Sequence, residues 1–373
     1  MKKKKISGTA AVILFSMVTG GLCGYLMISQ LAPLLDSIHG GPVTAALIMA
    51  GLVLGVYLLV FLHIAAHEAG HLIGGLLTGY RFASFRLGSL QLTRQNGRLQ
   101  WRLLHIAGTG GQCLMAPPEM TDGVFPVFAY NLGGPVMNLL LSAICILISL
   151  PLWGTAAAAI LLAAAVLGLF LGLINGIPMR MNGVDNDGYN ARSLKKNPAA
   201  MRAFWIQMQM AHQIAQGVRL KDMPADWFAP NPPEQMQNNL IATLSAFACN
   251  RLLDQGQIRD TAEAIDTLLA QPTGILGLHR NLLLCDRLFC ELVRDNNPDT
   301  VARLYTKDLQ KFMRSMKQYP TVLRTRYALA LLHHRDADTA AKLLTQFERT
   351  AAHHPYSCEI EGERELLALV KTD

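Results

Sequence analysis

Four long apolar stretches in the first half of the chain restrict what it can fold into. They run over residues 6–31, 43–77, 125–150 and 155–177. An α-helix needs about 20 apolar residues to cross the roughly 30 Å of hydrocarbon in a bilayer. Because the bilayer core offers no water to backbone groups, each stretch must pair its own N–H and C=O groups as a helix. We therefore expect an all-α polytopic membrane protein with about four transmembrane helices.

The rest of the chain has the composition of a soluble helical protein. The whole sequence is 51% hydrophobic and 16% charged, but its apolar residues concentrate before about residue 179. This contrast predicts three parts. They are an N-terminal anchor helix with an outer turn (1–41), a membrane core (42–190) and a cytoplasmic helical domain (191–373).

Positive charge beside the spans indicates their orientation. Cytoplasmic loops of membrane proteins carry an excess of Lys and Arg, and such residues precede the first span and follow the second and the fourth. Both termini are therefore expected in the cytoplasm. Membrane orientation accounts for most of the net charge of +7, and no nucleic acid is expected as a partner. The basic residues concerned are Lys2, Lys3, Lys4, Lys5, Arg81, Arg86, Arg94, Arg98, Arg102, Arg180, Arg192, Lys195 and Lys196.

A short polar run, HEAGH, interrupts the second apolar stretch at His67, Glu68 and His71. Residues i and i+4 share one face of a helix, so both imidazoles can point at one metal ion with the carboxylate beside them. By chance this pattern often marks a solvated helix face with two unrelated histidines. Here the neighbours are apolar, and ionisable residues inside a membrane are costly and therefore functional by default. The run predicts a transition-metal site, with zinc as the first choice and Glu68 moving protons.

Two further polar clusters are expected at the depth of HEAGH. Residues 131–138 read NLGGPVMN at the start of the third span, and residues 175–188 read NGIPMRMNGVDNDG at the exit of the fourth. In the topology above, all three clusters lie near the cytoplasmic leaflet. Asn131 and Asn138 are two helical turns apart, and because an unpaired amide in lipid is unfavourable, both are expected to face the protein interior.

These motifs, in this order, resemble those of the site-2 protease family of intramembrane zinc metalloproteases. The likeness covers roughly residues 43–190, about 40% of the chain. It implies that His67 and His71 bind Zn²⁺ and that Glu68 is the general base. It also implies a bacterial cell-membrane protein of several spans.

In this family the third zinc ligand is an Asp from an Asn-x-x-Pro…Asp-Gly segment. The matching residues here are Asn175, Pro178, Asp187 and Gly188. The chain departs from the family by a longer stretch before Asp187, so Asp185 competes for the ligand role. Asp187 is favoured because Gly188 follows it. The resemblance also assigns three asparagines to support of the substrate or of the transition state, namely Asn131, Asn138 and Asn175.

His63 lies on the same helical stripe as the HEAGH histidines. It is eight residues from His71, about 12 Å along a helix axis at 1.5 Å per residue. A third ligand from this position is geometrically awkward. The expected role is a partner that orients a ligand, or a buried histidine with satisfied hydrogen bonds.

Alternating apolar residues between the second and third spans predict a β-hairpin over residues 81–112. The sequence Gln95-Asn96-Gly97-Arg98 is a turn signal at its centre. We expect this hairpin at the cytoplasmic membrane surface. An extended substrate peptide could pair with the edge of this hairpin as an added strand. Such pairing would help, because peptide hydrolysis requires an unwound backbone rather than a helix.

The cytoplasmic part carries an internal repeat. An Asp-Thr pair recurs at intervals of 39 residues, and each pair precedes an apolar-periodic helix. Asp is a favourable N-cap, and paired helices at a fixed period predict a tetratricopeptide-like repeat domain. An irregular helical bundle is the alternative. The pairs are Asp260-Thr261, Asp299-Thr300 and Asp338-Thr339.

Together these features predict an intramembrane zinc endopeptidase that cuts a membrane-embedded substrate near the cytoplasmic face. The expected partners are a membrane-anchored protein or peptide as substrate, the lipid bilayer, and an adaptor or substrate tail on the repeat domain. The alternative is a catalytically minor or inactive family member that acts as a membrane-substrate binding or adaptor protein through its helical repeats.

Overall fold

The computed structural model describes residues 41–95, 97–103, 110–181 and 184–370, with scattered positions between 14 and 32. The predicted span at 6–31 lies largely outside the described residues. The described part is mostly helical, and the chain divides into two compact units. One comprises Met1–Gly88 with Ile106–Asn197, and the other comprises Ser89–His105 with Pro198–Asp373.

Three helices of the first unit are long and apolar enough to span a membrane. They are α2 (Pro42–Leu77), α3 (Phe128–Ser149), which continues into the 3₁₀ turn η1 (Leu150–Leu152), and α4 (Ala156–Gly176). The second, third and fourth apolar stretches of the sequence are thus confirmed to be helices. Thr155 begins α4 by accepting a hydrogen bond from the backbone of Ala158.

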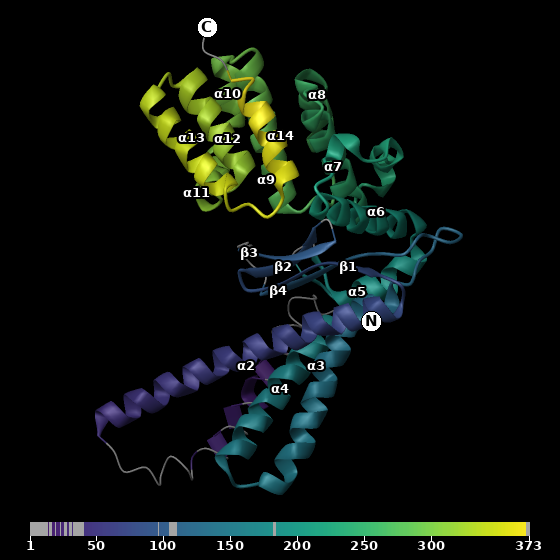
Figure 1. Cartoon of the computed structure of the whole chain (residues 1–373), viewed down its shortest axis with the longest axis vertical. Coiled ribbons are helices and arrows are strands. Elements are labelled where there is room, and N and C mark those ends of the chain that lie inside the picture. The colour runs from purple at the N-terminus through teal and green to yellow at the C-terminus, as the bar shows by residue number, and fades with distance from the viewer. Residues whose placement is uncertain are drawn as a thin grey trace, which may run out of the picture. The chain divides into compact units, whose positions relative to one another are not determined.

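Glycines allow α2 and α3 to approach at backbone distance, and α4 lies beside α3 (Figure 1). A Cβ atom on Gly70 of α2 would overlap the carbonyl oxygen of Gly133 of α3, and one on Gly133 would overlap that of Gly70. Gly168 of α4 leaves room in the same way for the ring of His63. In a bilayer, lipid would provide no hydrophobic force between such helices, and close contact of this kind would hold them together. It also places the HEAGH turn directly against the start of α3.

The region of the predicted hairpin contains four strands. In the first unit, β1 (Arg81–Leu87) pairs antiparallel with β4 (Gly111–Ala116). In the second unit, β2 (Leu90–Gln95) pairs antiparallel with β3 (Arg98–Leu103), which confirms the predicted turn. Gly97 in that turn has φ of +76°, a conformation that favours glycine.

The first unit ends in a short hairpin and a helix that follow α4. The elements are β5 (Arg180–Met181), β6 (Val184–Asp185), α5 (Asp187–Ser193) and the 3₁₀ turn η2 (Leu194–Lys196). Gly188 lies so close to Gly176 that a Cβ atom would overlap its carbonyl oxygen. The start of α5 is therefore fixed against the end of α4.

Helices make up most of the second unit. Its core lies around α9 and α12, where Phe289 and Val322 are fully buried. The elements in chain order are α6 (Pro198–Ala215), η3 (Leu220–Asp222), η4 (Ala225–Phe228), η5 (Pro233–Gln235), α7 (Asn239–Asp254), α8 (Ile258–Ala270), α9 (Gly277–Arg294), α10 (Pro298–Leu304), α11 (Lys307–Ser315), α12 (Pro320–Ala328), the π turn η6 (Leu329–His333), α13 (Ala337–Ala351) and α14 (Ser357–Leu367).

The three Asp-Thr pairs do not cap helices as predicted. The N-caps of α8, α10 and α13 are Gln257, Asn297 and Asp336, so each predicted capping aspartate lies within the first turn. There its charge still interacts favourably with the helix dipole. The helix starts recur at nearly the predicted spacing, but the middle pair differs, because α10 has only 7 residues and α11 follows it.

Candidate metal site

His67, His71 and Asp187 form a group that could hold a metal ion. His67 Nε2 lies 3.0 Å from His71 Nε2, and Asp187 Oδ2 lies 3.2 Å from the first and 3.5 Å from the second. Ligands of a tetrahedral zinc ion at 2.0–2.1 Å would be about 3.3 Å apart. The donor atoms therefore have a separation that fits a single ion.

Asn186 positions the carboxylate of this group. Its side-chain oxygen accepts hydrogen bonds from the backbone of Met179, at 3.0 Å, and of Tyr189, at 2.9 Å, which makes it the N-cap of α5. Its amide nitrogen donates to the carbonyls of Ile174 and Ile177 at the end of α4. Asn186 thus joins two helices and sets Asp187 as the first residue of α5. The sequence interpretation missed this role.

The structure brings Asp187, and not Asp185, to the histidines. Asp185 instead pairs with Arg180, with 2.5 Å between Oδ1 and Nε, and its side chain is 5% exposed. Burial would raise the pKa of the Asp187 carboxyl, but the nearby rings of His67 and His71 outweigh burial and lower this pKa to about 2. Asp187 is therefore ionised at neutral pH, as metal binding requires.

Gly134 leaves space for the donor atoms. A Cβ atom at this position would lie 2.6 Å from His67 Nε2 and 2.6 Å from His71 Nε2. Any side chain here would occupy the volume that the two nitrogens face. This supports a fit between these residues and a bound ion, and it gives the Gly-Gly of the NLGGPVMN motif a specific purpose.

A backbone carbonyl fixes the proton of His71. Its Nδ1 lies 2.7 Å from the carbonyl oxygen of Tyr130, which can only accept a hydrogen bond. Nδ1 therefore carries the proton, and Nε2 presents its lone pair to the group. Tyr130 is held in turn, because its hydroxyl donates to the carbonyl of Cys113 at 2.8 Å and its ring stacks on Tyr80.

Two side chains, those of His63 and Asn138, and the carbonyl of Ala164 connect in a chain of contacts to Nδ1 of His67. His63 Nε2 lies 2.8 Å from the carbonyl oxygen of Ala164, so Nε2 donates and His63 Nδ1 accepts. The amide of Asn138 lies between the rings, with its oxygen 3.3 Å from His63 Nδ1 and its nitrogen 3.2 Å from His67 Nδ1. The two ends of an amide have the same outline, so the amide can turn its N–H₂ to His63 and its oxygen to His67. His67 then donates from Nδ1 and keeps Nε2 for an ion.

We expect Asn138→Leu to weaken metal binding about ten- to a hundredfold, the usual effect of losing an outer partner of a ligand histidine. Leucine has a similar volume but cannot accept a hydrogen bond from His67. Asn131→Leu is the matched control, because Asn131 is also buried in α3 but donates to the carbonyl of Val127 in its own helix. Competition with a chelating dye measures both affinities. Equal loss in the two variants would contradict this role of Asn138.

Glu68 lies beside the metal-ligand group without belonging to it. Its side chain is largely buried, and the backbone N–H of Cys113 on β4 donates a hydrogen bond to it. A Cβ atom on Gly111 of β4 would lie 2.7 Å from the Glu68 side chain. The start of β4 therefore holds this carboxylate in place.

The three predicted asparagines differ in their contacts. Asn138 reaches the ligand histidines, as described above. Asn131 donates to the carbonyl of Val127 at 2.7 Å, and Asn175 donates to that of Leu171 at 3.0 Å. Of these three asparagines, only Asn138 has a described hydrogen bond to a member of the metal-ligand group.

Comparison of the chain with models of protein families, with curated proteins and with solved structures finds no match. What the chain does is therefore inferred from its motifs and from the geometry of this site.

Proposed function

We propose that the chain is an intramembrane zinc endopeptidase, which hydrolyses a peptide bond of a membrane-embedded substrate near the cytoplasmic face. The observation that carries this proposal is the group of His67, His71 and Asp187 with Glu68 beside it, at the end of a helix long and apolar enough to span a membrane. An intact ligand group with an adjacent base favours hydrolysis over the alternative of an inactive adaptor.

The membrane arrangement belongs to the same proposal. We place the chain in a bacterial cell membrane with four spans, the first at 6–31, and with both termini in the cytoplasm. The basic residues beside the spans support this orientation. The metal-ligand group then lies toward the cytoplasmic leaflet, because it combines two residues from the last third of α2 with the first residue of α5, which follows the exit of α4.

Zinc is the metal that this donor set favours. Two imidazole nitrogens and one carboxylate oxygen are the three protein ligands of many catalytic zinc sites, which keep a fourth position for water or substrate. A bound zinc ion would supply an activated water molecule and would polarise the scissile carbonyl group.

Glu68 performs the proton transfers in this proposal. Its carboxylate accepts the proton of the attacking water and then delivers it to the departing amine. The contact with β4 keeps the carboxylate aimed at the metal-ligand group while the histidines stay fixed by Tyr130 and Asn138. The chain's own residues thus provide orientation and proton movement.

The hairpin of β2 and β3 has the surface of a lipid-contacting element. Its polar face is covered within the second unit, where Gln91 and Thr93 are fully buried. Its other face exposes apolar side chains, with Trp101 at 65% and Leu103 at 66%. We assign this face to the membrane surface, where Trp is favourable, and the helical part of the second unit to a repeat domain that binds a substrate tail or an adaptor.

Removal of the metal tests the proposal. Purified protein in lipid vesicles should contain one zinc ion per chain and should cleave a membrane-inserted peptide. Treatment with a chelator should abolish cleavage, and one equivalent of zinc should restore it. Metal content is measured by mass spectrometry and cleavage by separation of the fragments. Cleavage that persists after complete removal of the metal would overturn the proposal.

A further inference from the structure

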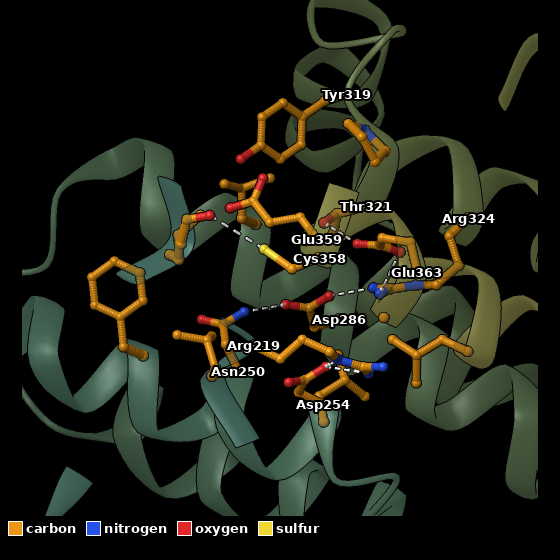
Figure 2. A pocket seen from close by; sticks show the side chains of 18 of the residues that line it. Arg219, Asn250, Asp254, Asp286, Tyr319, Thr321, Arg324, Cys358, Glu359 and Glu363 are labelled. Carbon is orange, nitrogen blue, oxygen red and sulfur yellow. Dashed lines mark hydrogen bonds and ion pairs between the residues drawn. The ribbon is translucent and has the colours of Figure 1, made fainter. Parts of the chain in front are cut away.

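The second unit contains a cavity of about 360 Å³ that the proposed chemistry does not use. It lies between side chains of α7, α9 and α14, the start of α12 and the segment after α6 (Figure 2). Ligand pockets commonly have volumes of about 300–1,000 Å³. The walls combine apolar side chains, such as those of Phe247 and Leu282, with several charged ones.

Both arginines of the cavity are already neutralised. Arg324, which is 1% exposed, binds Asp286 through one terminal nitrogen and Glu363 through the other, the latter at 2.9 Å. Arg219 binds Asp254 at 2.6 Å and also pairs with Glu365. With two carboxylates on each guanidinium, neither arginine is left to attract an anion.

The carboxylates of the cavity outnumber its cations. Lys221 adds a second positive charge to the Arg219 cluster, at 3.4 Å from Glu365, so that cluster is neutral. The Arg324 cluster holds one positive and two negative charges. A further carboxylate, that of Glu359, has among the described contacts only His354, whose Nε2 is 3.6 Å away.

The pKa shifts of the cavity residues are those expected where negative charge exceeds positive charge. Burial lowers the pKa of His354, so this ring does not supply a positive charge at neutral pH. Burial also raises the pKa of Asp286 to about 6, in spite of Arg324.

The shape of the cavity indicates which cation fits. The charged groups lie beside apolar walls, which suit the aliphatic stem of a long basic side chain. The carboxylate of Glu359 is directed into the space between the labelled side chains (Figure 2) and is 44% exposed. The side-chain oxygen of Asn250, which shares the cavity wall, could accept a further N–H bond.

We propose that this cavity binds a lysine or arginine side chain of a peptide segment, with Glu359 as the main anionic contact. The segment we assign is the cytoplasmic flank of the membrane substrate, because such flanks are rich in Lys and Arg. The identity of the partner rests on the proposed function, whereas the binding of a basic side chain does not.

The test uses the full chain in nanodiscs of uncharged lipid, with Glu68→Gln to prevent cleavage. The probe is a fluorescent peptide that contains two lysines and two arginines, and the control peptide has glutamine at these four positions. We expect saturable binding of the basic peptide only. Glu359→Gln should weaken it about ten- to a hundredfold, the range for a hydrogen bond between charged groups.

Glu361→Gln is the matched control, since it removes the same charge from an exposed position of α14 outside the cavity. It should leave binding unchanged, and circular dichroism should show that both variants are folded. Equal weakening by both substitutions, or equal binding of the two peptides, would overturn the proposal.

A second measurement separates this proposal from the peptidase. The chain without the Glu68 substitution is assayed on a membrane peptide with a basic or a glutamine flank. A lower KM for the basic flank that Glu359→Gln removes would support the assigned partner. Specific binding without cleavage of either peptide would overturn the peptidase and leave the cation site standing.

Discussion

Glu68→Gln should abolish peptide hydrolysis while the protein keeps about one zinc ion per chain. Glutamine has the same shape, and its amide oxygen can still accept the hydrogen bond from Cys113. It cannot take a proton from water, so we expect turnover to fall by at least the roughly 10²- to 10⁴-fold that general acid–base catalysis contributes. Fragment analysis of a membrane-inserted peptide measures turnover, and mass spectrometry measures zinc.

Glu119→Gln is the control for this experiment, because Glu119 is an exposed carboxylate in a loop of the same unit. It should retain full activity. Undiminished cleavage in Glu68→Gln would remove Glu68 from the chemistry. Loss of zinc together with activity would instead make Glu68 part of the ligand environment.

Asp187→Ala should lower zinc occupancy and activity together. This substitution removes the only oxygen donor of the metal-ligand group, and we expect the affinity for zinc to fall by more than the roughly hundredfold that an outer partner can cost. Asp185→Ala should have a much smaller effect, because it breaks only a pair with Arg180, whose side chain is 40% exposed. Zinc titration and the cleavage assay are run on both variants.

The zinc affinities of the two variants show which aspartate of the motif is the third ligand. If Asp185→Ala lost the metal and Asp187→Ala kept it, the third ligand would lie two residues earlier than the structure places it. Loss in both variants to the same extent would indicate that the hairpin of β5 and β6, and not one carboxylate, determines binding.

The three long apolar helices were predictable because each is a run of apolar side chains of the length that crosses a bilayer. A run of apolar side chains is enough to place α2, α3 and α4, whatever their neighbours are. The turn of the β2–β3 hairpin was predictable for a similar local reason, since Gly97 adopts positive φ. In both cases the information lies within a few consecutive residues.

The choice between Asp185 and Asp187 needed the structure. The stretch after α4 has no helical or strand periodicity, so spacing could not tell which carboxylate turns inward. Two hydrogen bonds of Asn186 decide it: its amide nitrogen donates to the carbonyl of Ile174 in α4, and its oxygen accepts from the backbone N–H of Tyr189 in α5. For His63 the helical spacing predicted an orienting role or a buried one, and the structure adds the specific partner, Asn138.

Other features depend on contacts between distant parts of the chain. The helix caps were mispredicted because a second polar residue, Asn297 or Asp336, stands a few residues before the expected aspartate and accepts the bonds. The cavity was not predictable, because its walls come from several helices that are distant in the sequence. Each of their charged residues, taken alone, resembles a residue on a solvent-exposed helix face. The excess of negative charge appears only when the fold brings these residues together.

The order of the metal-ligand residues along the chain has a consequence for biosynthesis. The two histidines are made early, in α2, but Asp187 follows the last membrane helix and reaches them only after α4 has been inserted and Gly188 has packed on Gly176. A nascent chain that ends before this point has Glu68 but no complete site. If the site has the proposed peptidase activity, that activity cannot begin before α4 and the start of α5 have been made and packed together.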